Sequence, residues 1–360
     1  MSDTLKLGSA TAAVGDRATG WLRATGLPTG GEERLPVILF NGGEGPTAWV
    51  TATVHGDEVV GLAVAQELAG LDPETVTGRL VVVPTLNPAG LRRRERVSYY
   101  DDEDPNRKFP DPFSDRTAPL STQERVAEQV YEAFTETVRA DLLLDLHTAG
   151  AGAVPFTIRD RVLYGKTRTE DDARLLAGET AALADAVNLP VVTEYPADQY
   201  TDRTLHRSTA GAALNGAGLP ALTLELGEAD HIRPDHRAAG LAAVCRGLAA
   251  ADVLRAVPDG VAAADPGVDA PVDYPVRRFE GPRAKAAGVV RHRVEPGDRV
   301  ESGQPVAAVT SPHGEVIETV TSDRDGYVLA HREGALAYEN QPVCSMAVRD
   351  EGALVAQREQ

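Results

Sequence analysis

Three short motifs, far apart along the chain, end in side chains that could bind a metal ion. In "WVTATVHGDE" an apolar run stops at His55, and Glu58 follows three residues later. "DLLLDLH" ends at His147, and "ALTLE" ends at Glu225. Two imidazoles and one carboxylate, with the fourth position left to water, are the ligand set of a catalytic zinc site. We therefore predict that His55, Glu58 and His147 bind one Zn²⁺ per chain.

A catalytic site of this kind also needs a base, because the attacking water has to lose a proton. Zinc lowers the pKa of bound water towards ~7 and polarises a carbonyl group. Glu225 is the candidate general base and the later proton donor to the leaving amine. Taken singly, His147 could be a core histidine and Glu225 a salt-bridged carboxylate. Asp145, two residues before His147, is interpreted as either a partner of that imidazole or a buried anion.

These side chains have to be positioned by the strands of an α/β fold. Short apolar segments are expected to form strands at residues 36–40, 49–54, 79–84, 141–147 and 221–226. Helices are expected at residues 58–71, 121–140, 169–188 and 238–256. Ser121 and Glu124 predict a capping box for the second helix. Continuous apolar strands are typical of sheets covered on both faces, so the pattern predicts a mixed, mostly parallel sheet flanked by helices. In such a sheet, ligands gather at the carboxyl ends of the strands.

The composition and the hydrophobic pattern of the sequence change after the last expected helix. Residues 257–275 are rich in Pro, Gly, Ala and Asp without periodicity, and we interpret them as a linker. Residues 276–360 hold short alternating segments broken by "EPGD", "ESGQ", "SPHG" and "SDRDG", which predict a small all-β, barrel-like domain. This part resembles hammerhead-like barrels related to lipoyl and biotinyl domains, without a lysine near "SDRDG" to carry a cofactor. We expect residues 1–256 to form the catalytic domain and the β domain to shape its mouth.

The charge of the chain excludes several classes of partner. A net charge of −18 argues against a nucleic-acid binder and against adhesion to an anionic membrane surface. Only four of the 36 basic residues are lysines. Acidic surfaces with few lysines and abundant alanine resemble proteins of salt-loving archaea, where salt screens self-repulsion. The alternative is a GC-rich genome with a mildly acidic proteome.

Cysteine usage and the start of the chain indicate a compartment. Cys245 and Cys344 lie far apart and belong to no paired motif, which favours a reduced, cytoplasmic protein. The first residues show no basic segment followed by an apolar one, so no signal peptide is expected. No apolar run approaches the ~20 residues that span a bilayer.

The order of four separated segments resembles a known family. "HGDE", "NPAGLRRRERVSYYDDEDPNRKFP", "DLHT" and "LELGE" are similar to the motifs of the succinylglutamate desuccinylase/aspartoacylase family. These proteins are zinc amidohydrolases on a carboxypeptidase-like α/β fold, and the similarity covers most of residues 45–230. The resemblance implies that His55, Glu58 and His147 bind zinc and that Glu225 activates water.

The resemblance also assigns two groups to the substrate. The family's Asn-Arg pair falls on Asn106 and Arg107, which are expected to grip the substrate carboxylate, since a guanidinium matches a carboxylate with two hydrogen bonds. Arg96 matches an arginine ten residues before that asparagine in some members. Its expected role is to stabilise the oxyanion of the tetrahedral intermediate. The alternative is that Arg96 belongs to a surface basic cluster with residues 92–94.

Two features depart from the family's pattern. The family commonly has "DLNR" where this chain has "DPNR", and Pro105 fixes its own φ, so the following loop is expected to be set differently. Residues 194–220 match only loosely. Within them Tyr200, Arg203 and Arg207 are candidates for a second substrate anchor, the alternative being an ordinary polar loop.

These observations lead to one main functional hypothesis and two alternatives. The main hypothesis is a zinc-dependent deacylase that cleaves the amide bond of a small N-acyl amino acid. One alternative is a metallocarboxypeptidase that acts on peptide C-termini, which would need an open groove. The other is a zinc-binding regulatory protein without catalysis, in which Glu225 would have no purpose. No nucleic-acid or membrane partner is expected, and a homo-oligomer is compatible with the sequence.

Overall fold

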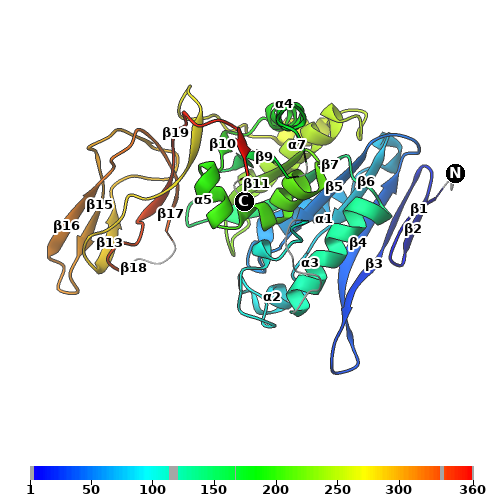
Figure 1. Ribbon diagram of the computed structural model, residues 1–360, viewed down its shortest axis with the longest axis horizontal. Coiled ribbons are helices and arrows are strands. Elements are labelled where there is room, and N and C mark those ends of the chain that lie inside the picture. The colour runs from blue at the N-terminus through cyan, green and yellow to red at the C-terminus, as the bar shows by residue number, and fades with distance from the viewer. Residues whose placement is uncertain (1–3, 113–120, 167, 333–335, 359–360) are drawn as a thin grey trace.

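A twelve-stranded mixed sheet runs through the protein (Figure 1). The computed structural model describes residues 4–112, 121–166, 168–332 and 336–358. From one edge to the other its strands are β14 (Arg299–Val300), β17 (Gly326–His331), β19 (Cys344–Arg349), β12 (Val276–Glu280), β10 (Val191–Thr193), β8 (Phe156–Arg159), β11 (Ala221–Glu228), β7 (Leu142–Ala149), β5 (Thr47–Ala52), β6 (Arg79–Val83), β4 (Glu32–Asn41) and β3 (Asp16–Gly26). Pairing is parallel in two blocks, β11-β7-β5-β6 and β8-β10-β12. The two blocks meet antiparallel at β8-β11, so the sheet is mixed as predicted.

Helices cover both faces of the central strands. On one face, α1 (Val59–Leu68), α4 (Glu170–Val187) and α7 (Pro234–Ala250) bury leucines such as Leu144 and Leu224. On the other, α3 (Thr122–Glu132) and its π-helical continuation η3 (Ala133–Thr137) pack near Trp49 and Leu143. Successive strand residues therefore enter different cores, which explains why these strands are apolar throughout. None of the helices in the described part of the chain has the length and apolarity of a membrane span.

The remaining elements are short. They are β1 (Thr4–Leu7), β2 (Ala10–Ala13), η1 (Pro73–Thr75), α2 (Pro88–Arg93), η2 (Pro105–Arg107), β9 (Val162–Tyr164), α5 (Ala197–Asp202), η4 (Leu205–Arg207), α6 (Thr209–Gly211), η5 (Ala212–Ala217), α8 (Asp259–Ala264), β13 (Gly288–His292), β15 (Pro305–Thr310), β16 (Val316–Thr321), β18 (Leu336–Ala337) and β20 (Val355–Gln357). Most of them connect the large elements or form the β-rich end of the molecule.

The periodic segments of the sequence form the elements that were expected from them. The five predicted strands are β4, β5, β6, β7 and β11, and the four predicted helices are α1, α3 with η3, α4 and α7. The capping box of Ser121 and Glu124 is present at the start of α3. The antiparallel strands β1 to β3 were not predicted, because they alternate exposed and buried residues and contain few large apolar side chains.

The C-terminal β strands continue the central sheet. β12 pairs in parallel with β10, and β19, β17 and β14 follow it towards the edge, while β13, β15, β16 and β18 form a second sheet. Residues 257–275 contain α8 and pack Val261 and Val268 on the α7 side of the core, so this connection is more ordered than expected. The division into residues 1–256 and 276–360 stays a prediction, and residues 1–3, 333–335 and 359–360 lie outside the described residues.

The end of the chain returns to the α/β part. β20 pairs in parallel with β9, and Arg161, which precedes β9, is 1% exposed. The Arg161 guanidinium binds both oxygens of Asp350 at 3.1 Å and donates to the carbonyl groups of Tyr195 and Ala353 at 2.8 Å. This buried cation holds the segment between β19 and β20 against the strands that line the cavity described below.

Removing this cation should cost more than removing an exposed one. Breaking a buried ion pair leaves the partner charge buried and unpaired. Arg161→Met should therefore lower the free energy of unfolding by about 3–5 kcal/mol, measured by urea denaturation. Arg174 provides the control, because its side chain lies on the exposed side of α4, where it pairs with Glu170. Arg174→Met should change stability by no more than about 0.5 kcal/mol. A loss below about 1 kcal/mol for Arg161→Met would show that this contact does not hold the C-terminal segment.

Candidate active site

The loop after β5 aims His55 and Glu58 at one point. β5 ends at Ala52, and Thr53 then adopts a left-handed conformation with a φ of +53°, which is uncommon for a β-branched residue. A Cβ atom at Gly56 would lie 2.1 Å from the backbone of Gly90 in α2, so only glycine fits there. The sharp turn brings Glu58 to the start of α1, three residues after His55.

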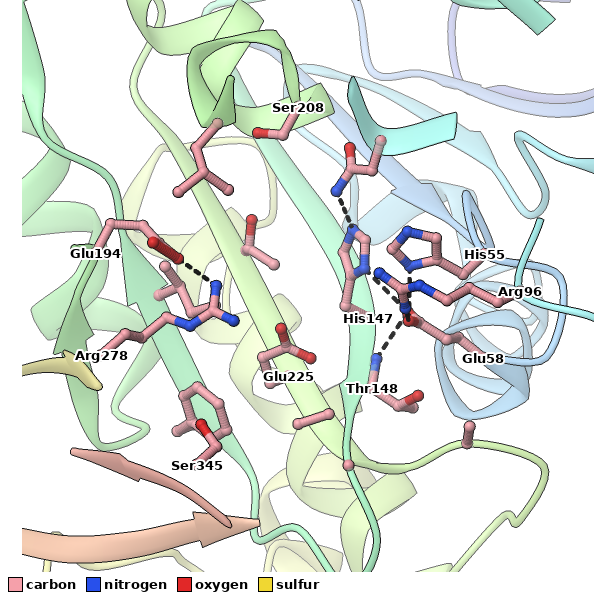
Figure 2. A pocket seen from close by; sticks show the side chains of 18 of the residues that line it. His55, Glu58, Arg96, His147, Thr148, Glu194, Ser208, Glu225, Arg278 and Ser345 are labelled. Carbon is pink, nitrogen blue, oxygen red and sulfur yellow. Dashed lines mark hydrogen bonds and ion pairs between the residues drawn. The ribbon is translucent and has the colours of Figure 1, made fainter. Parts of the chain in front are cut away.

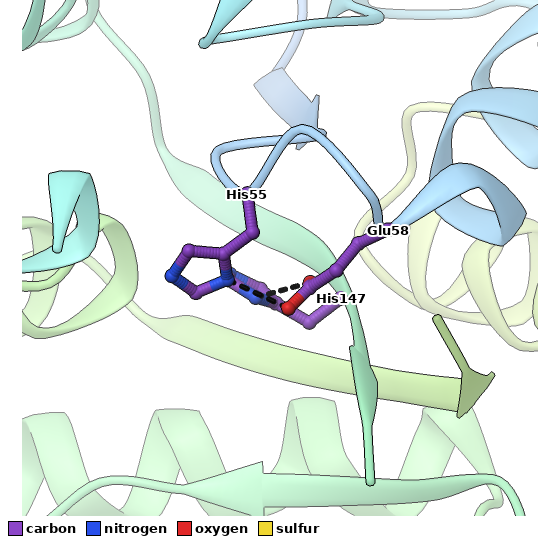
Figure 3. Close-up of side chains that lie close together, drawn as sticks. All are labelled: His55, Glu58 and His147. Atoms are coloured by element: carbon purple, nitrogen blue, oxygen red, sulfur yellow. Dashed lines mark hydrogen bonds and ion pairs between the residues drawn. The ribbon is translucent and has the colours of Figure 1, made fainter. Parts of the chain in front are cut away.

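Two histidines and one glutamate converge in a buried cluster, which Figure 3 shows in close-up. His55 Nδ1 lies 2.7 Å from Glu58 Oε1, and His147 Nδ1 lies 2.9 Å from Glu58 Oε2. One donor atom from each residue falls within 4.8 Å of the others, and all three residues are buried. The structure thus brings together the three predicted metal ligands, and the cluster could hold a metal ion.

The far nitrogen of each imidazole is held by an aspartate. His55 Nε2 lies 3.0 Å from Asp104 Oδ1, and His147 Nε2 lies 2.8 Å from Asp145 Oδ2. When Nε2 carries the proton and donates it to a carboxylate, Nδ1 presents its lone pair towards Glu58, as metal-ligating histidines require. Asp145 therefore acts as a partner of His147. It also accepts a hydrogen bond from Thr51 Oγ1 at 2.7 Å.

The cluster is strongly coupled electrostatically. Burial acts to raise the pKa of Glu58, but the adjacent charges of His55 and His147 outweigh it and hold the pKa well below its ordinary value. Burial acts to lower the pKa of His147, but Asp145 and Glu58 outweigh it and raise the pKa well above its ordinary value. The site therefore stabilises positive charge between its ligands, which is what a bound cation would supply.

Glu225 stands beside the triad on the neighbouring strand. β11 runs parallel to β7, with Glu225 in register with His147. Both residues lie inside their strands, which continue to Glu228 and Ala149, and not at the strand ends where they were expected. Glu225 is 8% exposed, and its Oε2 accepts no hydrogen bond from any described residue. Burial raises the pKa of Glu225, so this carboxylate is suited to accepting a proton.

Arg96 faces the triad, whereas its basic neighbours do not. Its Nη1 donates to Glu58 Oε1 at 3.1 Å, and its Nη2 donates to Asp104 Oδ2 at 3.4 Å. By contrast, residues 92–94 pair with Glu33, Glu95 and Asp230. The structure thus separates Arg96 from the surface cluster that was its alternative assignment.

Asn106 and Arg107 lie on the short helix η2 and line the same cavity. Pro105 occupies the first turn of η2, where no N–H is needed, and Asp104 caps the helix by accepting from the Asn106 N–H at 2.9 Å. Asn106 Oδ1 accepts from the backbone N–H of Thr209 at 2.8 Å. Among the described residues, the Arg107 guanidinium donates only to the carbonyl oxygen of Asn106, from Nη1 at 2.6 Å, which leaves most of its donors available.

The three candidates for a second anchor do not line the cavity. Tyr200 is fully buried, and its hydroxyl donates to Asp160 Oδ2 at 3.1 Å. Arg203 pairs with Glu280 at 3.2 Å on the outer side. Arg207 Nε donates to the carbonyl oxygen of Phe109 at 3.0 Å. A polar loop of this composition serves here mainly to support residues that do reach the cavity.

The cavity of about 250 Å³ spreads across one face of the sheet, from β7 through β11, β8 and β10 to β12 and β19 (Figure 2). Its wall includes several residues that the sequence did not single out: Asp160, Glu194, Ser208, Arg278, Glu280 and Ser345. Arg278 and Glu194 form an ion pair on the wall opposite the triad. For the four charged residues among them, the sequence signal was a charged side chain within or just after a short apolar segment.

Comparison with known proteins identifies the family. The sequence model of the succinylglutamate desuccinylase/aspartoacylase catalytic domain matches residues 44–251, more than half of the chain. The chain belongs to this family, as its motifs predicted. It is similar to an N-alpha-acetyl-L-2,4-diaminobutyric acid deacetylase from Halomonas elongata, with 36% identity over 124 residues. That match spans 33% of this chain and 33% of the relative.

Solved structures share the fold over nearly the whole chain. The product-bound ectoine utilization protein EutE (DoeB) from Ruegeria pomeroyi has a TM-score of 0.72 at 24% identity, covering 96% of this chain and 99% of that chain. A succinylglutamate desuccinylase/aspartoacylase from Rhodobacter sphaeroides has a TM-score of 0.74 at 22% identity, covering 93% and 96%. The C-terminal β strands are therefore included in the shared fold.

The carboxylate behind His147 should govern metal affinity. Replacing an outer partner of a ligating histidine typically costs about 10- to 100-fold in metal affinity, so Asp145→Asn should weaken metal binding by that factor. Competition with a chromogenic chelator measures the affinity. Asp185→Asn, the same change on the exposed side of α4, is the control and should leave it unchanged. Unaltered affinity in a folded Asp145→Asn protein would contradict this role.

Proposed function

We propose that the protein is a zinc-dependent deacylase that hydrolyses the amide bond of a small N-acyl amino acid. The observation that carries the proposal is the placement of Glu225, whose unpartnered carboxylate oxygen lies in the same cavity as the His55, Glu58 and His147 cluster. A structural metal site has no need of a buried free base beside it. A hydrolytic site needs one, because water must be deprotonated as it attacks.

The donor set supports zinc as the ion. Two imidazole nitrogens and one carboxylate suit Zn²⁺, whereas Mg²⁺ and Ca²⁺ prefer oxygen donors alone. The orphaned Glu225 oxygen and the aspartate-held imidazoles fit an open catalytic site on this face of the sheet. When bound, zinc would acidify a water molecule and polarise the scissile carbonyl group.

The protein's own groups can carry the remaining steps. Glu225 takes a proton from the attacking water and delivers it to the amide nitrogen as the C–N bond breaks, which releases a carboxylic acid and an amine. Arg96 directs a guanidinium into the cavity, where it can stabilise the negative charge that develops on the carbonyl oxygen. Arg96 stays protonated, because the nearby carboxylates of Glu58 and Asp104 raise its pKa by more than burial lowers it.

Asn106 and Arg107 are suited to hold the substrate carboxylate. Burial, with repulsion from Arg278, lowers the pKa of Arg107 despite the nearby Asp104, so this cation is incompletely compensated by the protein. A carboxylate that enters the cavity can supply the missing charge and accept two hydrogen bonds from the planar fork. Asn106 is itself fixed by Thr209, which keeps the pair in place.

The relatives and the cavity size favour this reaction over the alternatives. The Halomonas elongata relative is an N-alpha-acetyl-L-2,4-diaminobutyric acid deacetylase, and an N-acyl amino acid of that size suits a cavity of about 250 Å³. A peptide would need an open groove. Here Arg278, Glu280 and Ser345 of the C-terminal β strands form part of the wall, which supports the proposal that this part of the chain shapes the mouth.

The reaction can be tested directly with purified protein. N-acetyl and N-succinyl amino acids should release free amine in high salt when zinc is present, and a chelator should abolish the release. Peptides should not be shortened from their C-termini. Zinc-loaded protein that hydrolyses none of these amides would overturn the proposal.

Replacing Glu225 tests the base. Glu225→Gln should lower kcat by about 10²- to 10⁴-fold, because the amide cannot accept the proton, while the zinc content stays near one per chain. Zinc is measured by mass spectrometry on the same sample. Glu179→Gln, an identical change on the exposed side of α4, should keep kcat within about twofold. Near-normal turnover in Glu225→Gln would remove Glu225 from the mechanism.

A further inference from the structure

Three charged side chains stand next to each other on the wall opposite the metal cluster. β8, β10 and β12 are parallel neighbours; Asp160 and Glu194 lie just beyond the carboxyl ends of β8 and β10, and Arg278 lies in the middle of β12. The backbone fixes this alignment, since the Glu194 N–H donates to the Arg159 carbonyl at 2.9 Å and Thr193 is in register with Arg277. Asp160 is 6% exposed and Glu194 is 1% exposed, and all three side chains line the cavity.

The bonding capacity of Glu194 is already used within the protein. Its Oε1 pairs with Arg278 Nη1, and its Oε2 accepts from the Tyr195 N–H at 3.1 Å. Arg278 is held in turn, with its guanidinium 5.1 Å from the centre of the Tyr195 ring. Figure 2 shows this ion pair on the wall facing the triad. The charge of Arg278 is thus already balanced by Glu194, whereas Arg107 donates to a neutral carbonyl oxygen.

Asp160 is different, because half of its carboxylate has no partner. Its Oδ2 accepts from the Tyr200 hydroxyl, which is oriented by Asn215 Nδ2 at 3.1 Å. Its Oδ1 accepts no hydrogen bond from the described residues, although the side chain is more than nine-tenths buried. Burial and the neighbouring Glu194 raise the pKa of Asp160 to about 8. Without a cation beside it this carboxyl group is therefore largely protonated at neutral pH, and a bound cation would favour its ionised form.

We propose that Asp160, supported by Glu194, forms a subsite for a protonated amino group on the substrate side chain. This inference rests on the proposed deacylase function and narrows its substrates to N-acyl amino acids that carry a second amine. The ammonium group donates to Asp160 Oδ1, which accepts no hydrogen bond from the described residues. Asn106 and Arg107 bind the carboxylate, and the acylated nitrogen faces Glu225.

The charges of this wall agree with such a substrate. When the ammonium group ionises Asp160, Asp160 and Glu194 contribute two negative charges, and Arg107 and Arg278 contribute two positive ones. Glu280, which also lines the cavity, is paired with Arg203, Arg283 and Arg332. A substrate with one carboxylate and one ammonium group keeps this balance, whereas an N-acyl dicarboxylic amino acid would add two negative charges to a buried site. Unbalanced charge in a desolvated site is costly, so the cavity should discriminate against dicarboxylates. The charge of Arg278 is already matched by Glu194, so a second substrate carboxylate placed beside Arg278 would lack a compensating charge.

A substrate panel on the zinc-loaded full-length protein tests the subsite. The panel holds Nα-acetyl derivatives of diamino acids with one to three side-chain methylene groups, of uncharged amino acids of matching length, and of aspartate and glutamate. The best diamino substrate should exceed its uncharged match by about 10-fold or more in kcat/KM, because it adds a hydrogen bond to a charged group. The dicarboxylic substrates should be the poorest.

The wild-type panel distinguishes failure of the subsite from failure of the function. If uncharged or dicarboxylic substrates are cleaved as well as the diamino ones, the subsite is wrong while the deacylase function stands. If zinc-loaded protein cleaves none of the panel, the proposed function itself fails. Both results come from the wild-type protein, so neither depends on a variant that folds.

Asp160→Asn then locates the subsite. This change should lower the ratio of kcat/KM for the diamino substrate to that for its uncharged match by about 10- to 100-fold. Asp198→Asn, the same change at an exposed position on α5, should leave the ratio unchanged. A folded Asp160→Asn protein that keeps the full preference would overturn the assignment to Asp160.

Discussion

Compensation of a buried anion at Glu58 is the constraint on which this active site depends. A carboxylate that is 2% exposed would cost several kcal/mol without partners. His55 and His147 approach its two oxygens, and Arg96 and the Thr148 N–H complete the shell. These partners come from three separate stretches of chain, so the turn after β5 and the pairing of β5 with β7 have to be correct together.

The sheet provides this site because its two faces differ in chemistry. Along β7, Leu144 and Leu146 enter the apolar core under α1 and α7, whereas Asp145 and His147 point to the opposite face. Along β11, Glu225 likewise alternates with buried leucines. The polar face of β7 and β11 borders a cavity whose other side chains are also largely polar. The C-terminal strands β12 and β19 extend the same sheet, and their residues Arg278, Glu280 and Ser345 form part of the cavity wall.

The sequence singled out the residues around the His-Glu-His cluster better than those of the opposite wall, for a physical reason. His55, Glu58, His147 and Glu225 belong to long apolar strands or directly follow one, so pattern and chemistry coincide. Asp160 and Glu194 directly follow strands of four and three residues, and Arg278 lies in a strand of five. Their meeting depends on pairing between segments more than 30 residues apart. Tyr200 illustrates the same limit, since its polar group supports Asp160 from behind and does not face the cavity.

The incompletely paired groups of the cavity suggest how a small substrate is oriented. Among the described residues, Arg107 donates a hydrogen bond only to a neighbouring carbonyl oxygen, and Asp160 Oδ1 and Glu225 Oε2 accept none. Pairs that are satisfied internally, such as Glu194 with Arg278, fix the shape of the wall and gain little from a ligand. Incomplete pairing at three separate points is what allows a molecule with three polar groups to displace water in a single orientation.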